Sequence, residues 1–409
     1  MPNMVRLSRC VAVGATLACL VGCGSSSPSA NAAGGSPGSA GSDNSGVAGS
    51  GPISMGTSTA ADVAAKLGRP ANFLIGMGND LNNDHSMDGA YTLGTTLDIH
   101  YAYLSAYQMN GGFHSWVEWN TDGTFVNILT DSASAKGVVP MFSMYEMAAV
   151  GDGALAALTT DAFEKLYWSD MTTLFKRLGA FDKPAIVHLE PDFWAYAQQQ
   201  SKGDPASMKV KVKANAPDCA DLSDDLIGMG HCLVKLARKY APKTLLGFHA
   251  SEWAGDPAAT AAFLKAVGAG EADVVFADML DRDAGCFEAH TDPVCQRTGT
   301  FYWDESNTTS PNFSEYLAWS KAISSGVGRP MMWWQIPLGV PSTTPGGSMG
   351  HYRDNRVHYL FSHVQEFVNA GGVAALFGTG AEHQTYIDSD GGQFKTAVTG
   401  YFAHPVALP

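Results

Sequence analysis

The feature that most constrains the fold is a series of eight short apolar runs, separated by longer and mostly amphipathic stretches. The runs are Phe73–Met77, Leu97–Tyr103, Val138–Met144, Ala185–Leu189, Leu245–His249, Val274–Ala277, Pro330–Trp334 and Val373–Phe377. Most are continuously apolar, which is typical of parallel strands covered on both faces. Eight strand–helix repeats predict an α/β fold, a (β/α)8 TIM-like barrel.

The stretches between the runs carry helical patterns. We expect helices over Asp161–Leu178, Leu222–Tyr240, Pro257–Val267, Phe313–Ser324, Asp354–Asn369 and Gln393–Phe402. The link between the first two runs is the least helical. A doubly wound open sheet is the alternative fold. It would carry a glycine-rich phosphate loop after its first strand, but Gly76-Met77-Gly78-Asn79 lacks the third glycine and the helix that should follow.

Residues 1–22 form a secretory signal peptide. Arg6 and Arg9 precede an apolar run, Cys10–Val21, that is too short to span a bilayer comfortably. The motif Leu20-Val21-Gly22-Cys23 resembles a bacterial lipobox, which implies cleavage before Cys23 and lipid attachment to that cysteine. An ordinary secretory signal with a chance cysteine is the alternative.

A flexible linker is expected at residues 23–58. It consists almost entirely of Gly, Ser, Ala, Pro and Asn, and Asp43 is its only charged residue. The folded domain then covers residues 59–409. We expect a monomer in the cell envelope, held on a membrane by the lipid at Cys23, on the periplasmic or cell-surface side.

Four cysteines remain after the signal and the lipidated Cys23, and they form two close pairs in the sequence. Proximity favours disulfides Cys219–Cys232 and Cys286–Cys295, which suits an exported protein. A metal site is the alternative, but these spacings do not match zinc ligands of the CxxC type. No metal is expected at Asp278–Asp283 either, since this acidic run lacks the glycine and the distant glutamate of a calcium loop.

The charge balance excludes nucleic acid as a partner. The chain of 409 residues has 25 Lys and Arg against 39 Asp and Glu, a formal charge of −14. Its one short basic run, Lys209–Lys213, is interpreted as a solvated strand or loop. There is no HExxH or Walker motif, and no cofactor is expected.

Acidic and aromatic residues gather after the predicted strands, where a barrel builds its site. The candidate catalytic residues are Glu190, Asp192, Glu252 and Asp278, and the candidate substrate-binding residues are Trp194, His249, Trp253, Trp303, Trp333, Trp334, Gln335 and Glu382. Carboxylates can transfer protons, and indole rings can stack on sugar rings. This combination fits glycoside hydrolysis, which uses two carboxylates on either side of the bond.

The fourth run carries the most informative residues, His188-Leu189-Glu190-Pro191-Asp192. Strand alternation predicts that His188, Glu190 and Asp192 share one face, and Pro191 marks the end of the strand. Glu190 and Asp192 are therefore expected at the barrel mouth, pointing inward. By the same alternation, only one of Trp333 and Trp334 should face the interior.

Glu190-Pro191-Asp192 resembles the Glu-Pro-Asp at the same strand end in family 6 cellulases. The similarity continues through Leu246–Trp253 and Asp256–Ala259, so that it covers roughly residues 183–260. The resemblance implies that Asp192 donates the proton to the leaving oxygen and that the substrate is a β-1,4-glucan.

Leu189-Glu190-Pro191 also resembles, in part, the Asn-Glu-Pro of clan A barrel glycosidases. That resemblance makes Glu190 the acid/base residue. The clan's nucleophile is a glutamate after the seventh strand, where this chain has Gln335, and an amide cannot act as that nucleophile.

The sequence therefore predicts a glycoside hydrolase acting on a polysaccharide or oligosaccharide. Asp192 or Glu190 is the general acid, with Asp278 or Glu252 as its partner. A glycan-binding lipoprotein that has lost its chemistry is the second hypothesis, and Gln335 is the feature that favours it. A purely structural envelope lipoprotein is the third.

Overall fold

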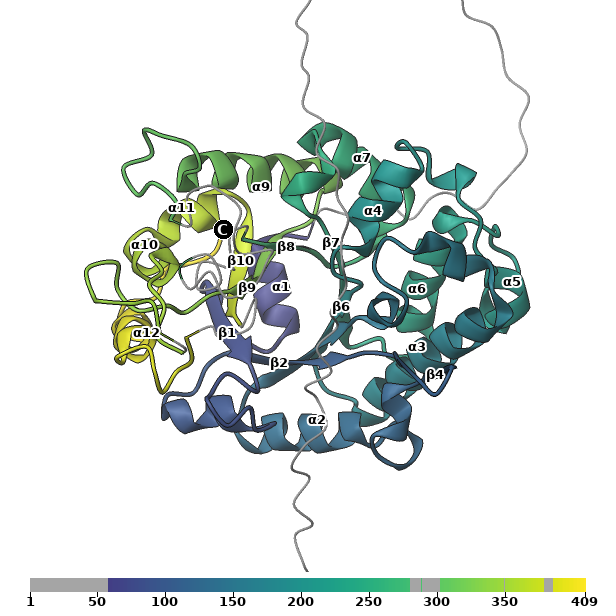
Figure 1. The fold of residues 1–409 in the computed structure, drawn as a ribbon, viewed down its shortest axis with the longest axis horizontal. Coiled ribbons are helices and arrows are strands. Elements are labelled where there is room, and N and C mark those ends of the chain that lie inside the picture. Colours follow the sequence, from purple (N-terminus) through teal and green to yellow (C-terminus); the bar gives the residue numbers. More distant parts are fainter. Residues whose placement is uncertain (1–57, 280–287, 289–301, 349, 379–384) are drawn as a thin grey trace, which may run out of the picture. The chain divides into compact units, whose positions relative to one another are not determined.

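The computed structural model describes residues 58–279, 288, 302–348, 350–378 and 385–409. Within these residues, eight parallel strands close a barrel in the order β1-β10-β9-β8-β7-β6-β5-β2, with helices around it (Figure 1). The strands are β1 (Leu74–Gly78), β2 (Ile99–Leu104), β5 (Val139–Met144), β6 (Ala185–Leu189), β7 (Thr244–His249), β8 (Val274–Asp278), β9 (Met331–Ile336) and β10 (Gly372–Phe377). The predicted (β/α)8 barrel and its eight strands are confirmed.

All six predicted helices are present, one of them with a break, and the described residues also form four helices that were not predicted. They are α1 (Ala60–Lys66), α2 (Phe125–Ala135), α3 (Asp161–Phe181), α4 (Phe193–Gln200), α5 (Val212–Asn215), α6 (Leu226–Tyr240), α7 (Pro257–Ala266), α9 (Phe313–Val327), α10 (Arg356–Ser362), α11 (Val364–Asn369) and α12 (Gln393–Ala403). The expected helix Asp354–Asn369 is interrupted at His363, whose backbone is not helical. The first strand-to-strand link contains only a short 3-10 turn, Gly89–Leu93.

A small hairpin follows β2 that the sequence reasoning missed. Its strands, β3 (Tyr107–Met109) and β4 (Gly112–His114), are three residues each, too short to show alternation. Asn110 and Gly111 both have positive φ, as a tight hairpin turn requires. The hairpin lies against α3, where the rings of Phe113 and Phe163 are 5.4 Å apart.

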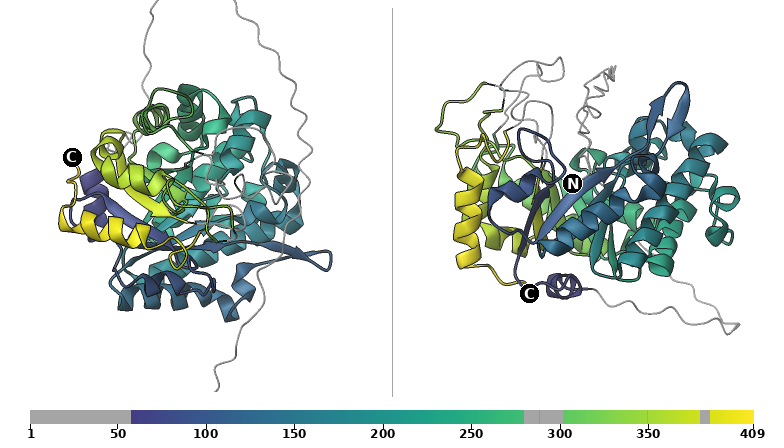
Figure 2. Two further views of the ribbon diagram at one scale, coloured as in Figure 1. Left: turned by 60° about the vertical axis from the view of Figure 1, so that its left-hand side comes forward. Right: turned by 90° about the horizontal axis from the view of Figure 1, so that it is seen from below.

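Helix α1 lies at the end of the barrel opposite to the mouth (Figures 1 and 2). Its Lys66 contacts Asp273, the residue that precedes β8, at 3.2 Å. Because the strands are parallel, the amino ends of all eight meet there and the carboxyl ends meet at the other rim.

Among the described helices, none is long and apolar enough to cross a membrane.

Large rings fill the barrel interior and the layer outside it. Trp334 faces inward and contacts His188, while Trp333 faces outward and donates a hydrogen bond to Ser320 at 3.2 Å. One of the two tryptophans therefore faces the interior, as alternation predicts. Gly247 leaves room for the inward Phe276, because a Cβ there would lie 2.5 Å from that ring.

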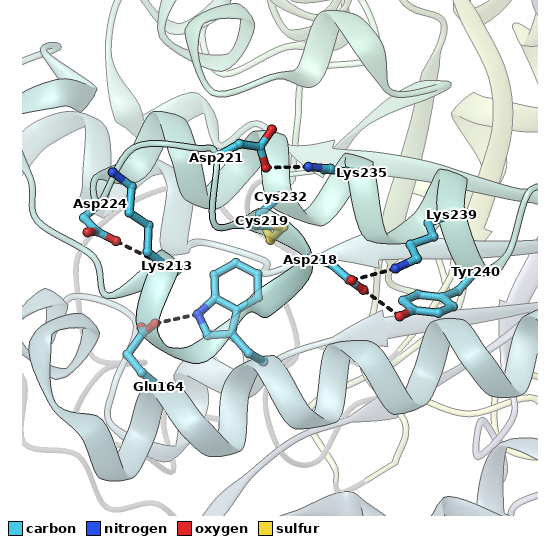
Figure 3. The surroundings of a disulfide bond; sticks show 11 residues. Glu164, Lys213, Asp218, Cys219, Asp221, Asp224, Cys232, Lys235, Lys239 and Tyr240 are labelled. Atoms are coloured by element: carbon cyan, nitrogen blue, oxygen red, sulfur yellow. Dashed lines mark hydrogen bonds and ion pairs between the residues drawn. A yellow bond between two sulfur atoms is a disulfide. The ribbon is translucent and has the colours of Figure 1, made fainter.

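The predicted disulfide Cys219–Cys232 is present (Figure 3). It ties the turn Pro217–Cys219 to α6, and exposed ion pairs from Asp218 and Asp221 to lysines of α6 lie beside it. Cys286 and Cys295 lie outside the described residues.

The basic run Lys209–Lys213 is not a solvated strand. Its two valines are buried while its lysines are half-buried or exposed. Lys209 forms a single bridge with Asp225, and α5 begins at Val212. The run is a short connection pinned by its apolar residues.

Removing this disulfide should destabilise the domain. The bond closes a loop over a sequence separation of 13, for which loop entropy predicts about 3 kcal/mol. We expect the double variant Cys219→Ser/Cys232→Ser to lose about this free energy of unfolding in urea titrations. Asp221→Asn, which breaks a neighbouring exposed ion pair, is the control and should leave the midpoint unchanged. Equal midpoints for all three proteins would contradict this account.

Candidate active site

The floor of the barrel mouth carries a chain of polar side chains on four neighbouring strands, β5 to β8. The Oγ of Ser143 is 3.2 Å from Nδ1 of His188, and Nε2 of His188 is 3.0 Å from Nδ1 of His249. Nε2 of His249 lies 3.3 Å from Oδ1 of Asp278, an electrostatic contact outside the angles of a regular hydrogen bond. All four residues are buried, so the chain crosses half of the barrel beneath the mouth.

Aromatic residues and an amide from β2 and β9 form the facing wall. Tyr101 and Tyr103 contact Trp334, with ring centroids 6.2 and 5.8 Å away. Gln335 donates its side-chain N–H to the hydroxyl of Tyr103 at 2.7 Å. Gln335 has a φ of 55°, a left-handed conformation that is uncommon for a residue with a Cβ and that clusters at functional sites.

Asp192 lies above this floor at the end of β6. Its Oδ1 is 3.4 Å from the hydroxyl of Ser251, which lies two residues beyond the end of β7. Asp192 is half-buried, so solvent reaches it. Glu252 follows Ser251 and is also half-buried. The pKa of Tyr316 is raised mainly by burial, and then by the charges of Asp278 and Glu252. Both acids therefore lie near the Tyr316 ring.

Glu190 does not point into the mouth as predicted. Its carboxylate is fully buried and accepts a hydrogen bond from the Met147 N–H at 3.1 Å, on the side of the wall where Tyr167 of α3 lies. The prediction is wrong because Glu190 has a φ of 46°, so the two-residue alternation of β6 ends before it. Burial raises the pKa of Glu190 to about 8.

Glu190 belongs to a group of buried acids between the barrel and α3. Burial raises the pKa of Asp170 to about 7 and that of Glu164 to about 8. The pKa of Glu146, which follows β5, is raised well above its usual value by burial and then by the neighbouring Asp170 and Glu190. These carboxyl groups are held in the neutral form at moderate pH.

Three of the predicted tryptophan platforms are core residues. Trp194 packs on Phe248 and donates to the carbonyl of Leu189, Trp303 packs on Phe313, and Trp333 packs on Phe367. Each is at most 3% exposed, so none offers a free ring face to a sugar. The prediction failed because position after a strand does not tell which way a ring turns.

Trp253 remains a candidate for substrate contact, whereas Trp334 is only 3% exposed and offers no free ring face either. Trp253 is half-buried in the short turn after β7, and its ring lies 4.7 Å from that of Tyr196. Trp334 and His249 line the interior beneath the mouth. Glu382 lies outside the described residues.

Sequence reasoning did not select Tyr103, Ser143 and His188 as site residues. It examined the residues that follow each strand, whereas these three are inward-facing positions within the strands. Asp80, which follows β1, is a further acid at the mouth that the sequence reasoning did not select. The carboxylate of Asp80 and the ring of Tyr101 both pack close to Gly78, since a Cβ added to Gly78 would lie 3.3 Å from each. Burial raises the pKa of Asp80.

No group of three or more His, Cys, Asp or Glu in the described part of the chain is arranged to hold a metal ion. The acidic run that begins at Asp278 continues into residues 280–283, which are outside that part. The described site therefore consists of carboxylates, imidazoles, hydroxyls and aromatic rings.

No protein-family model and no curated protein matches this sequence. Solved structures that resemble it include an endo-β-1,4-mannanase double mutant from Cellulomonas fimi, with 13% identity, 86% of this chain and 76% of that chain covered, and a TM-score of 0.49. A GH26 β-mannanase from Bacteroides ovatus has 9% identity, coverage of 84% and 92%, and a TM-score of 0.45. The endoglucanase Cel6 from Mycobacterium tuberculosis has 16% identity, coverage of 73% and 75%, and a TM-score of 0.35.

These structural neighbours are named as mannanases or an endoglucanase. Identities of 9 to 16% assign no activity to this chain, so its function has to be argued from its own site.

The buried acids predict that stability falls with rising pH. Their pKa values are raised in the folded state, so their contribution is complete below the ordinary carboxyl pKa and is lost as the pH rises through about 7 to 8. The buried His188, with a lowered pKa, acts in the opposite direction but only below about pH 6.5. Between pH 6.5 and 8.5, the free energy of unfolding should therefore decrease, by up to about 1.4 kcal/mol per pH unit for each group still protonated.

Urea unfolding at several pH values between these limits measures the effect. Glu190→Gln keeps the shape and the acceptor for Met147 but cannot ionise, so its slope should be shallower than that of the wild type. Asp182→Asn, at an exposed position at the end of α3, is the control and should keep the wild-type slope. Stability that stays level or rises over this range would show that the buried carboxyl groups are not neutral.

Proposed function

We propose that this protein is a glycoside hydrolase that cleaves a polysaccharide or oligosaccharide. In this proposal Asp192 is the general acid and Asp278 the general base. The observation that carries it is that these two carboxylates lie on either side of the carboxyl end of β7. Asp192 contacts Ser251 beyond that strand, and Asp278 contacts His249, its last residue.

The strand order sets the scale of the gap between the two acids. Asp192 follows β6 and Asp278 ends β8, with β7 between them (Figure 1). Two strand spacings separate their backbones by about 9 to 10 Å. A gap of this size leaves room for a water molecule, and inverting glycosidases have carboxyl groups roughly 6.5–9.5 Å apart. We therefore propose inversion of the anomeric configuration.

The chemistry then needs only these two acids and one water. Asp192 gives its proton to the glycosidic oxygen as the bond to the anomeric carbon breaks. Asp278 removes a proton from the water whose oxygen forms the new bond to that carbon. Afterwards Asp192 is ionised and Asp278 protonated, and exchange with solvent restores both.

Three other residues are less suited to these roles. Glu190 is fully buried on the α3 side of the wall, so it cannot contact a substrate at the mouth without a rearrangement of β6. Gln335, at the end of β9, is an amide that cannot form a glycosyl intermediate. Glu252 is half-buried and, like Asp278, raises the pKa of Tyr316, and it is the alternative base.

Aromatic side chains support a carbohydrate substrate. Trp253 and Tyr196 are partly exposed and pack against each other next to Ser251. Tyr103 is half-buried on the facing wall of the mouth. Flat rings of this kind bury large apolar area, which is what the apolar face of a sugar offers.

The second candidate function is glycan binding without cleavage. The hydrogen bond between Gln335 and Tyr103 favours it, because this strand end holds a neutral amide rather than a reactive acid. A binding protein would retain affinity for a glycan but release no new reducing ends.

Amide substitutions at the two acids should separate hydrolysis from binding. We expect the wild-type domain to release reducing ends from one of a panel of glucans and mannans. Asp192→Asn and Asp278→Asn should each lower kcat by about a hundredfold or more, since each removes one proton-transfer step. Their affinity for the glycan, measured by calorimetry, should change little.

Asp182→Asn, at the opposite end of the barrel, should keep full activity. Full activity in Asp192→Asn would remove it as the acid. Glycan binding by the wild type without any cleavage would support the binding protein instead.

We also propose that the mature chain begins at Cys23 and is lipid-anchored in the cell envelope. The lipobox and the linker that follows it support this proposal. In a bacterial host, the full chain should incorporate labelled palmitate and sediment with membranes, because acyl chains partition into the bilayer. Cys23→Ser should lose the label and be exported in soluble form. Unlabelled wild-type protein would contradict the anchor.

A further inference from the structure

We infer that Ser143, His188 and His249 act together as a positioning relay for Asp278, holding its carboxylate ionised and aimed at the attacking water. The inference rests on the proposed role of Asp278 as the base. None of the three relay residues needs to touch substrate, so they are positioning residues.

The distances allow two proton arrangements along the chain. In the first, the Ser143 hydroxyl donates to Nδ1 of His188, and Nε2–H of His188 donates to Nδ1 of His249. This leaves Nε2–H of His249 facing the Asp278 oxygen at 3.3 Å, which suits an ionised carboxylate. In the reversed arrangement a lone pair of His249 faces Asp278, which then has to carry a proton. The tautomers of both imidazoles are therefore tied to the charge on Asp278.

The surroundings keep His188 neutral and hold both rings in place. The ring of Phe276 stacks on His188 at 4.2 Å, and the edge of Trp334 contacts both imidazoles. Burial, and secondarily His249, lowers the pKa of His188 well below its ordinary value. A neutral pair can offer one N–H to Asp278 without adding a buried positive charge, which would be costly in this interior.

Other polar or charged groups around Asp278 and Tyr316 come from three further elements. Glu252 lies in the turn after β7, and the Tyr316 hydroxyl of α9 donates to the backbone carbonyl of Asp278. Arg356 of α10 opposes the effect of both acids on the pKa of Tyr316. The charges of Glu252 and Arg356 thus act on the pKa of Tyr316, whereas Nε2 of His249 contacts the carboxylate of Asp278 directly.

A matched pair of substitutions at His249 separates the two ends of the relay. His249→Gln places an amide N–H where Nε2–H was and keeps the donor to Asp278. His249→Asn places a carbonyl where Nδ1 was, which keeps the acceptor for His188 but loses the contact with Asp278. The pH dependence of kcat/KM and the separate values of kcat and KM are measured on the glycan that the wild type cleaves.

Loss of the donor should raise the pKa of Asp278. In His249→Asn we expect the acidic limb of kcat/KM to move up by about one pH unit and kcat to fall about tenfold or more, with KM nearly unchanged. His249→Gln should keep the wild-type limb and lose less kcat. If both variants keep the wild-type limb, or if both lose activity only in proportion to lost thermal stability, the relay is overturned.

NMR of the imidazole nitrogens tests the relay without any cleavage. In the wild type labelled with ¹⁵N-histidine, His188 should remain a neutral Nε2–H tautomer from pH 5 to pH 8, and Nδ1 of His249 should accept its hydrogen bond. Ser143→Ala, which removes only the far donor, should shift the His188 signals and leave the fold intact if His249 variants do not fold. Titration of His188 near pH 6.5, or an Nδ1–H tautomer of His188, would overturn the relay. If the wild type cleaves no glycan, the proposed hydrolase is refuted, but NMR still determines whether the imidazoles have the proposed tautomers.

Discussion

Two left-handed residues flank Pro191 at the end of β6, and the rest of the site depends on the direction they give the chain. Glu190, with a φ of 46°, places its carboxylate beside Met147 on the α3 side of the wall. Asp192, with a φ of 63°, places its carboxylate beside Ser251 at the mouth. Each such conformation costs about 1–2 kcal/mol for a residue with a Cβ, so the surrounding contacts must hold it. The backbone at this one turn decides which of two adjacent acids can meet a substrate.

The same turn separates two kinds of acidic environment. On the α3 side, Glu190 and its neighbours are buried with raised pKa values and are stable as neutral groups. On the mouth side, Asp278 faces an imidazole nitrogen and Asp192 faces a hydroxyl. The surroundings therefore give carboxyl groups two different roles: those beside α3 are structural, and those at the mouth have the proposed catalytic roles.

The architecture could be predicted from the sequence because it depends on patterns that extend over many residues. Apolar runs predict all eight strands and a first strand-to-strand link with little helix. The spacing of the cysteines predicts the disulfide Cys219–Cys232. Alternation predicts that only one of Trp333 and Trp334 faces the barrel interior, and in the structure it is Trp334. A pattern that extends over many residues still predicts the right element when one position in it is misinterpreted.

The site could be predicted only in part because it depends on single dihedral angles and on which face of a strand turns inward. The left-handed φ of Glu190 has no signature in its residue type, so alternation misplaced its side chain. Trp194 and Trp303 follow strands or lie in loops, yet they turn into the core. His188 and Ser143 lie inside apolar runs, and their partnership across strands appears only once the register of β5, β6 and β7 is known.

The most direct test of this account is the configuration of the sugar released first. ¹H NMR during hydrolysis of a defined oligosaccharide resolves the anomeric proton before mutarotation mixes the two forms. Acids placed on β6 and β8, with β7 between them, predict a first product whose configuration is opposite to that of the cleaved bond. A first product of retained configuration would contradict it, because retention needs two carboxyl groups about 5 Å apart and a nucleophile that this arrangement does not provide.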